Sequence, residues 1–168
     1  MIVLSSSVGI DFRDTAVAMV HCQRTLRGCV IRHSEFHVFP PNSEEETINE
    51  MASQEIKNFF RRHHIRTEHV RISIPRREAM VRLISLPDAA RENLDQVIQY
   101  EIDRYFPFSL GELCFDYYLM GPAARPKTIR LMLVAVKKER MQRYLEILKK
   151  ARIRPTAVEI SSTALANS

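Results

Sequence analysis

The sequence has no tryptophan, four glycines and three cysteines among its 168 residues, and these shortages exclude several classes of protein. Three cysteines cannot pair completely and show no C-x-x-C spacing, so we do not expect a disulfide framework. Apolar runs are far shorter than the roughly 20 residues of a membrane helix, and the N-terminus lacks the pattern of a signal peptide. Because 45% of the residues are hydrophobic, we expect a globular protein of the reducing cytoplasm.

Charge is segregated into blocks, although the net charge is only +5. Residues 35–55 carry six glutamates and no Lys or Arg, residues 61–82 carry seven arginines, residues 88–116 are acidic again, and residues 125–154 carry eleven bases. The excess of arginine suits contacts to phosphate or carboxylate, so a nucleic-acid-binding module is one hypothesis. Because the acidic blocks repel polyanions, we favour protein-docking surfaces and expect no specific nucleic acid.

The first part of the chain has the pattern of three meandering strands, a helix and a fourth strand. The helix has a single apolar face, and Ser43 with Glu46 predicts a capping box at its start. The apolar and β-branched runs that indicate strands lie at residues 8–12, 15–20, 29–39 and 69–75.

A second unit follows, with the order strand, helix, strand, strand, helix. Asp88 is the expected N-cap of its first helix, which Pro107 ends. A last short strand at 156–160 is expected to return to the first sheet. The remaining strands are expected at 80–86, 113–119 and 129–136, and the second helix has its apolar residues between Met141 and Leu148.

Glu101 projects into the apolar stripe of the first helix of this second unit. An unpaired carboxylate there is costly, so we expect it to cap local amides or to pair with an arginine and so fix the turn from Tyr105 to Leu110. A partner-facing carboxylate is the alternative.

Three sequence motifs carry a resemblance to a known family. They are Gly9-Ile10-Asp11-Phe12 at the first hairpin, the run E-I-D-R-Y-F-P-F-S-L from Glu101 to Leu110, and L-V-A-V-K-K-E from Leu133 followed by a helix and Arg154-Pro155-Thr156. Together they resemble the first half of an actin-like ATPase, in particular the type IV pilus assembly protein PilM and the cytoplasmic domain of general secretion pathway protein L.

The resemblance implies an α/β fold in which a partial ribonuclease-H-like (actin-like) domain carries an inserted small strand-helix-strand-strand α+β subdomain. We expect residues 1–77 and 154–168 to form the former and residues 78–153 the latter. Since the family continues through a second half, we expect the 168 residues to be a fragment of a longer chain, so the lack of a membrane helix in them says little about the whole protein.

The nucleotide-binding hairpin of the family is degenerate in this sequence. The family pattern is Gly-x-Asp-x-Gly-Ser/Thr, in which glycine lets backbone amides approach phosphate while aspartate serves hydrated magnesium. Gly9 and Asp11 match, but Arg13 replaces the glycine and Asp14 replaces the hydroxyl residue. Gly9, Asp11 and Arg13 are the candidate cofactor-binding residues of this degenerate hairpin. We expect no cofactor and no enzymatic activity, and binding of ATP with magnesium is the alternative.

Other catalytic chemistries lack the residues that they need. A two-metal nuclease on this fold could use Asp11 and Glu50, but the end of the fourth strand carries Arg76 and Arg77 where such enzymes offer an acid. The histidine pairs at 33 and 37 and at 63 and 64 have no metal-ligand spacing and are expected at the surface, so we predict no metal site.

Binding remains as the predicted function. In the family, PilM holds a cytoplasmic peptide of its membrane partner PilN in a groove, and secretion protein L docks the assembly ATPase. The resemblance thus implies a non-catalytic scaffold that is cytoplasmic and is peripheral or tethered to the inner membrane. Its implied partners are the pilus or secretion ATPase and a membrane-anchored protein that is PilN-like or secretion protein M-like. A homo-oligomer is a further expectation. The candidate partner-binding residues are Tyr105, Phe106 and Phe108, with the basic helix 137–154; internal packing is the alternative for this aromatic turn.

Overall fold

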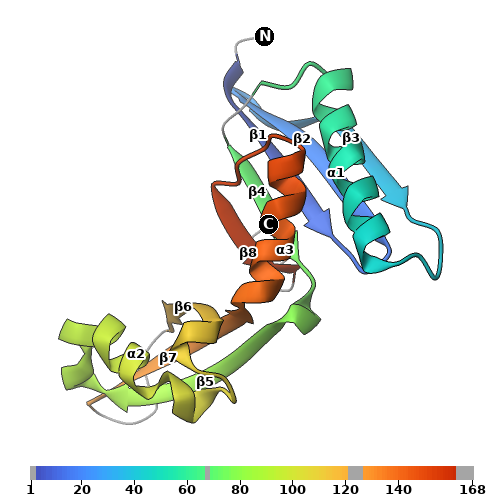
Figure 1. The fold of residues 1–168 in the computed structure, drawn as a ribbon. Helices are drawn as coiled ribbons and strands as arrows, with labels where there is room; N and C mark the ends of the chain where they lie inside the picture. The colour runs from blue at the N-terminus through green and yellow to red at the C-terminus, as the bar shows by residue number, and fades with distance from the viewer. Residues whose placement is uncertain (1–2, 67–68, 121–126, 162–168) are drawn as a thin grey trace. The chain divides into compact units, whose positions relative to one another are not determined.

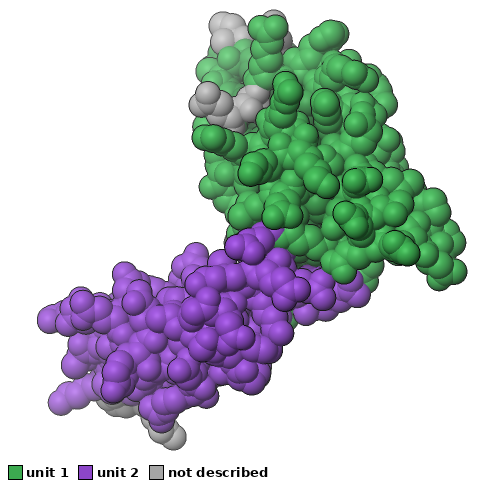
Figure 2. Space-filling view, viewed as in Figure 1, with its two compact units in different colours: residues 1–76, 143–168 green, residues 77–142 purple. Residues whose placement is uncertain are grey.

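The computed structural model describes residues 3–66, 69–120 and 127–161 (Figure 1). The chain divides into two compact units (Figure 2). Unit 1 comprises Met1–Arg76 with Arg143–Ser168, and unit 2 comprises Arg77–Gln142. Across the described ranges, no helix combines the length and the apolar composition that a membrane crossing requires.

Unit 1 is built on a mixed five-stranded sheet of order β3-β2-β1-β4-β8. The first three strands form an antiparallel meander, whereas β4 pairs parallel to β1 and β8 pairs parallel to β4. The elements are β1 (Val3–Phe12), β2 (Ala16–Thr25), β3 (Gly28–Val38), α1 (Glu45–Arg62), β4 (Val70–Ile74), α3 (Lys138–Lys150) and β8 (Ala157–Ile160).

The core of unit 1 follows from strict alternation in its strands. Every second residue of β1 from Val8 onward, and every second residue of β4, is apolar and buried, so one face of the sheet is hydrophobic. Helices α1 and α3 pack over the sheet in Figure 1, and each buries an apolar stripe. The buried side chains of this core include Val8, Ile10, Phe12, Ile56, Phe59, Val70, Ile72, Ile74, Ile147 and Leu148.

Unit 2 consists of an antiparallel three-stranded sheet of order β5-β7-β6 with one helix, α2, packed on it. Ile98 and Ile102 of the helix are fully buried against Leu131 and Leu133 of the central strand. The elements are β5 (Ala79–Pro87), α2 (Leu94–Tyr105), β6 (Leu113–Leu119) and β7 (Thr128–Lys137), with 3-10 turns at Arg76–Glu78, Asp88–Asn93 and Leu110–Glu112.

Two predicted helix caps are wrong. Helix α1 has Glu44 at its N-cap without a side-chain cap, and the hydroxyl of Ser43 instead donates to the carbonyl of Pro40 at 2.9 Å, because Ser43 still belongs to the preceding turn. Asp88 begins a 3-10 turn and pairs with Arg91, so α2 starts only at Leu94.

The expected domain boundaries, residues 1–77 with 154–168 and residues 78–153, also differ from the observed units at helix α3. The helix was expected to lie wholly in the inserted subdomain, but its residues from Arg143 onward belong to unit 1. The ring of Tyr144 packs on Phe12 with centroids 5.0 Å apart. Arg143 donates to Asn49 at 2.8 Å and pairs with Glu45 at 2.6 Å, which ties α3 to α1.

These contacts predict that Arg143→Ala destabilises unit 1. The arginine side chain is only 20% exposed, so we expect the free energy of unfolding to fall by about 1 kcal/mol in urea titrations. The matched control is Lys150→Ala on the same helix, whose pair with Glu50 is long, at 3.9 Å, and exposed; it should change stability by less than about 0.3 kcal/mol. Equal effects of the two substitutions would contradict this account of α3.

Candidate functional site

The hairpin between β1 and β2 brings two of the predicted cofactor-binding residues together. Arg13 Nε donates a hydrogen bond to Asp11 Oδ2 at 2.8 Å. The other carboxylate oxygen, Oδ1, accepts a hydrogen bond from the hydroxyl of Ser73 on β4. The guanidinium of Arg13 also lies over the ring of Phe36 on β3, 5.3 Å from its centroid. Both oxygens of Asp11 thus have donors from the protein itself.

The backbone of this hairpin differs from that of a phosphate-binding loop. Among the described residues, positive φ at non-glycine positions occurs only at Asn42, His64, Lys127 and Arg152. The residues of the turn therefore have no left-handed conformation, and the amide of Arg13 donates to the carbonyl of Ala16 within the turn. Loops that cradle phosphates need free amides in such conformations. The residues present thus do not fit the phosphates and magnesium of a nucleotide.

Gly9 lies two residues before Asp11 on the same strand. It pairs regularly with Val20 of β2, and its φ is not positive. A Cβ at this position would meet Val20 Cγ1 at 3.4 Å, close to an ordinary contact. Gly9 is thus an ordinary strand residue here.

The predicted partner-binding turn lies at the end of α2, and its three aromatic residues differ in exposure. Phe106 is 3% exposed and belongs to the core of unit 2. Tyr105 and Phe108 are half-buried and pack against the same core, and the ammonium of Lys137 lies 4.0 Å from the ring centroid of Phe108. Internal packing therefore explains Phe106, and Tyr105 and Phe108 remain the candidates for partner contact.

Glu101 is paired with an arginine, which is a structural role that the sequence predicted for it. Arg104 Nη1 donates to Glu101 Oε1 at 3.1 Å, and the hydroxyl of Tyr105 donates to Oε2 at 2.9 Å. Burial and this bond to a carboxylate raise the pKa of Tyr105. The predicted pairing with an arginine is confirmed, while its effect on the turn from Tyr105 to Leu110 and its contact with a partner stay predictions.

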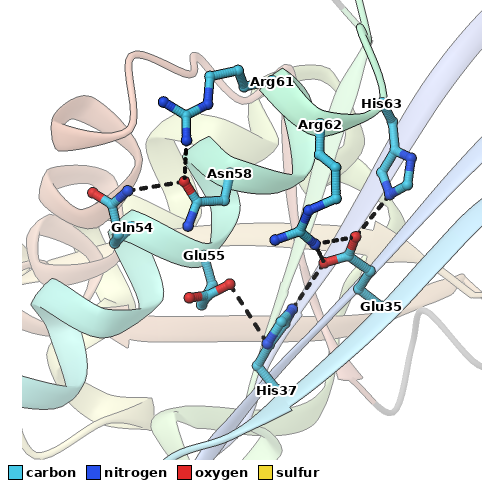
Figure 3. A network of polar contacts seen from close by, with 8 residues as sticks. All are labelled: Glu35, His37, Gln54, Glu55, Asn58, Arg61, Arg62 and His63. Carbon is cyan, nitrogen blue, oxygen red and sulfur yellow. Dashed lines mark hydrogen bonds and ion pairs between the residues drawn. The ribbon is translucent and has the colours of Figure 1, made fainter.

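Sequence reasoning missed a polar cluster between β3 and the end of α1 (Figure 3). We call it the Glu35 cluster; its members are Glu35, His37, Glu55, Arg62 and His63, with His33 and His21 stacked beside it. Glu35 is the centre: its carboxylate accepts from Arg62 at 2.6 Å, from His63 at 2.7 Å and from His37 at 2.9 Å.

The expectation that these histidines lie at the surface holds fully only for His64, because the other three are half-buried. His33 and His37 face α1 because they alternate with outward residues on β3, and His63 is half-buried above them; only His64 is exposed. The ring of His33 stacks on His63 at 4.0 Å and on the buried His21 at 5.6 Å. The signal that could have found the cluster is the period of two in His33, Glu35 and His37.

The cluster contains one carboxylate with a low pKa, and the pKa values of His21 and His33 are lowered as well. Burial raises the pKa of Glu35, but the hydrogen bonds from Arg62, His37 and His63 outweigh it and lower the pKa to about 2. Burial and the neighbouring histidines lower the pKa values of His21 and His33. Within the described residues, no group of three or more His, Cys, Asp or Glu side chains is arranged to hold a metal ion. The cluster can thus fasten β3 to α1 and respond to acid.

We expect the protein to lose stability as the pH falls below 6.5, the ordinary value for histidine. His21 and His33 have lowered pKa values in the folded state, so the unfolded chain takes up their protons first and protonation favours unfolding. Glu35 acts only at lower pH, between its ordinary 4.5 and about 2. Urea titrations at pH 7 and at about pH 5.5 measure how the free energy of unfolding changes with pH. In His33→Gln, this change should correspond to about half a proton less taken up on unfolding than in the wild type.

The matched control is His64→Asn. His64 is exposed and has φ of 50°, a conformation that asparagine tolerates. This variant should keep the pH dependence of the wild-type protein. Two results would contradict the assigned pKa directions: the same pH dependence of stability in His33→Gln as in the wild type, or a wild-type stability that rises as the pH falls.

Two solved structures share this fold. The structure described as "PilM-PilN type IV pilus biogenesis complex" superposes with a TM-score of 0.78 at 20% identity, over 94% of this chain and 48% of that one. The cytoplasmic domain of EpsL, an inner membrane component of the type II secretion system of Vibrio cholerae, superposes with a TM-score of 0.63 at 9% identity, over 92% of this chain and 57% of that one. The chain thus spans about half the length of each.

The sequence profile of one family covers nearly the whole chain. It matches residues 9–168, which begin within β1 and cover most of unit 1 and all of unit 2. The predicted actin-like fold is confirmed by this match together with the two superpositions. The chain therefore belongs to the family of the type IV pilus assembly protein PilM.

Proposed function

We propose that this chain is part of a non-catalytic scaffold in the assembly platform of a type IV pilus or a type II secretion system. The observation that carries the proposal is the family match over residues 9–168. One solved relative is a complex of PilM with PilN, and another is an inner membrane component of a secretion system. We propose by analogy a membrane-anchored, PilN-like or secretion protein M-like partner, which would hold the protein at the cytoplasmic face of the inner membrane.

The absence of catalysis is proposed from the hairpin between β1 and β2. In a nucleotide-binding relative, the strand aspartate must have oxygens available for hydrated magnesium. Here Asp11 already accepts from Arg13 and Ser73, and Asp14 adds a second negative charge where phosphates would lie. An ATP-binding PilM-like protein is the second candidate, which the family match alone favours.

The proposed docking surface for the partner is the exposed side of the aromatic turn after α2. Tyr105 and Phe108 present part of their rings to solvent, while Phe106 beneath them belongs to the core. Lys137 beside Phe108 adds a cation suited to an acidic peptide group. We propose the assembly ATPase as a second partner and leave its surface unassigned.

The test is binding of the purified protein to the cytoplasmic N-terminal peptide of the PilN-like protein, and to the assembly ATPase, encoded in the same genome. We expect micromolar affinity for the peptide, and Phe108→Ala should weaken it by about tenfold because the ring loses both its contact area and its cation–π contact. Fluorescence anisotropy of the labelled peptide measures the affinities of the wild type and of Phe108→Ala. A pulldown tests binding to the ATPase.

The control is Tyr100→Ala on α2, the helix that precedes the turn, because Tyr100 is 91% exposed and lies outside the turn. It should leave the peptide affinity unchanged. If Phe108→Ala binds like the wild type, the docking surface lies elsewhere. If neither the peptide nor the ATPase binds, the scaffold proposal is wrong.

A further inference from the structure

The three-stranded meander of unit 1 extends beyond the rest of its sheet. Parallel pairing with β4 begins only at Val8, whereas β1 pairs with β2 from Val3 onward. Strands β1 to β3 have ten or eleven residues, compared with five in β4 and four in β8, and their greater length is visible in Figure 1. We call the projecting part, residues 3–7 and 22–32, the ribbon.

The end of the ribbon is a well-defined two-residue turn. Thr25 pairs with Gly28, and its hydroxyl donates to the Gly28 carbonyl at 3.0 Å and accepts from the amide of Arg27 at 3.2 Å. Gly28 has φ of +123°, which only glycine adopts readily. The turn therefore holds Leu26 and Arg27 at the tip.

Large aliphatic side chains are exposed along the ribbon. Leu26 at the tip is 75% exposed, and Ile31 and Leu4 are 65% and 56% exposed. Val3 and Val30 are exposed as well. Single exposed aliphatic residues are common on proteins, but five in one short projection indicate an interaction surface.

The same end of unit 1 is strongly basic. Helices α1 and α3 run antiparallel to the strands that follow them, so both helices end where β4 and β8 begin. The segments 24–32, 61–66 and 149–154 at this end together carry ten Lys and Arg and no Asp or Glu.

Most of these cations have no acidic side chain to neutralise them. Within the described part of the chain, Arg24 and Arg27 on the ribbon form no ion pair. Among the described glutamates, Glu35 is already paired with Arg62 and Glu159 with Arg71. A partner at this surface must therefore supply negative charge.

We propose that this end of unit 1 binds the surface of a bilayer that contains anionic phospholipids. Leu26 and Ile31 enter the interface, and Arg24 and Arg27 contact lipid phosphates. An anionic bilayer supplies both the charge and the apolar region that this surface requires. Nucleic acid would use the arginines but not the aliphatic tip, because single strands bind through stacking on aromatic rings and duplexes through phosphate contacts.

The test is co-sedimentation of the purified protein with vesicles of phosphatidylcholine, with and without phosphatidylglycerol. We expect binding to the anionic vesicles alone, weakened by added salt. The double substitution Arg24→Gln and Arg27→Gln should lower the affinity at least about tenfold, since each base near an anionic surface contributes about fivefold. Leu26→Gln should lower it about fivefold without loss of the folded circular dichroism spectrum.

The controls are Arg91→Gln and Leu83→Gln, which change an exposed arginine and an exposed leucine of unit 2. Both should bind vesicles like the wild type. Equal binding to neutral and anionic vesicles would overturn the proposal, as would tight binding of duplex DNA together with an inert Leu26→Gln. The test contains no partner protein, so its outcome is independent of the proposed scaffold function.

Discussion

The carboxylate of Asp11 connects four strands on one face of the unit 1 sheet. It lies on β1, accepts from Ser73 of β4, and pairs with Arg13 of the turn that leads to β2. Arg13 in turn covers Phe36 of β3. In the family's pattern this aspartate serves a nucleotide, but here its donors come from the protein. The hairpin is thus closed by its own hydrogen bonds, which supports the proposal that the protein binds partners and not a nucleotide.

The sequence predicted the order of the elements because their apolar periodicity is strong. The alternation in β1 and β4 and the apolar stripe of α1 show directly which residues are buried. The misses have two causes. Ser43 bonds back to Pro40 and Asp88 pairs with Arg91, so turns replace the first helical turns that the sequence predicted. Helix α3 joins unit 1 through Phe12 and Asn49, which are far away in the sequence.

The candidate sites also differ in how far the sequence could predict them. Arg13 and Asp11 are two residues apart, so their conflict with a phosphate-binding loop was readable from the sequence. The Glu35 cluster joins residues 27 and 28 positions apart, and its histidines look like surface residues when each is considered alone. Long-range pairing places them between a strand and a helix, where hydrogen bonds from Arg62, His37 and His63 lower the pKa of Glu35.

We propose above all that the hairpin of Asp11 and Arg13 does not bind a nucleotide. Calorimetric titration of the full-length protein with Mg-ATP tests it most directly. We expect no binding in the micromolar range, because both oxygens of Asp11 are occupied and Asp14 repels phosphate. Saturable micromolar binding that Asp11→Asn abolishes would contradict the account and assign the protein to the nucleotide-binding members of its family.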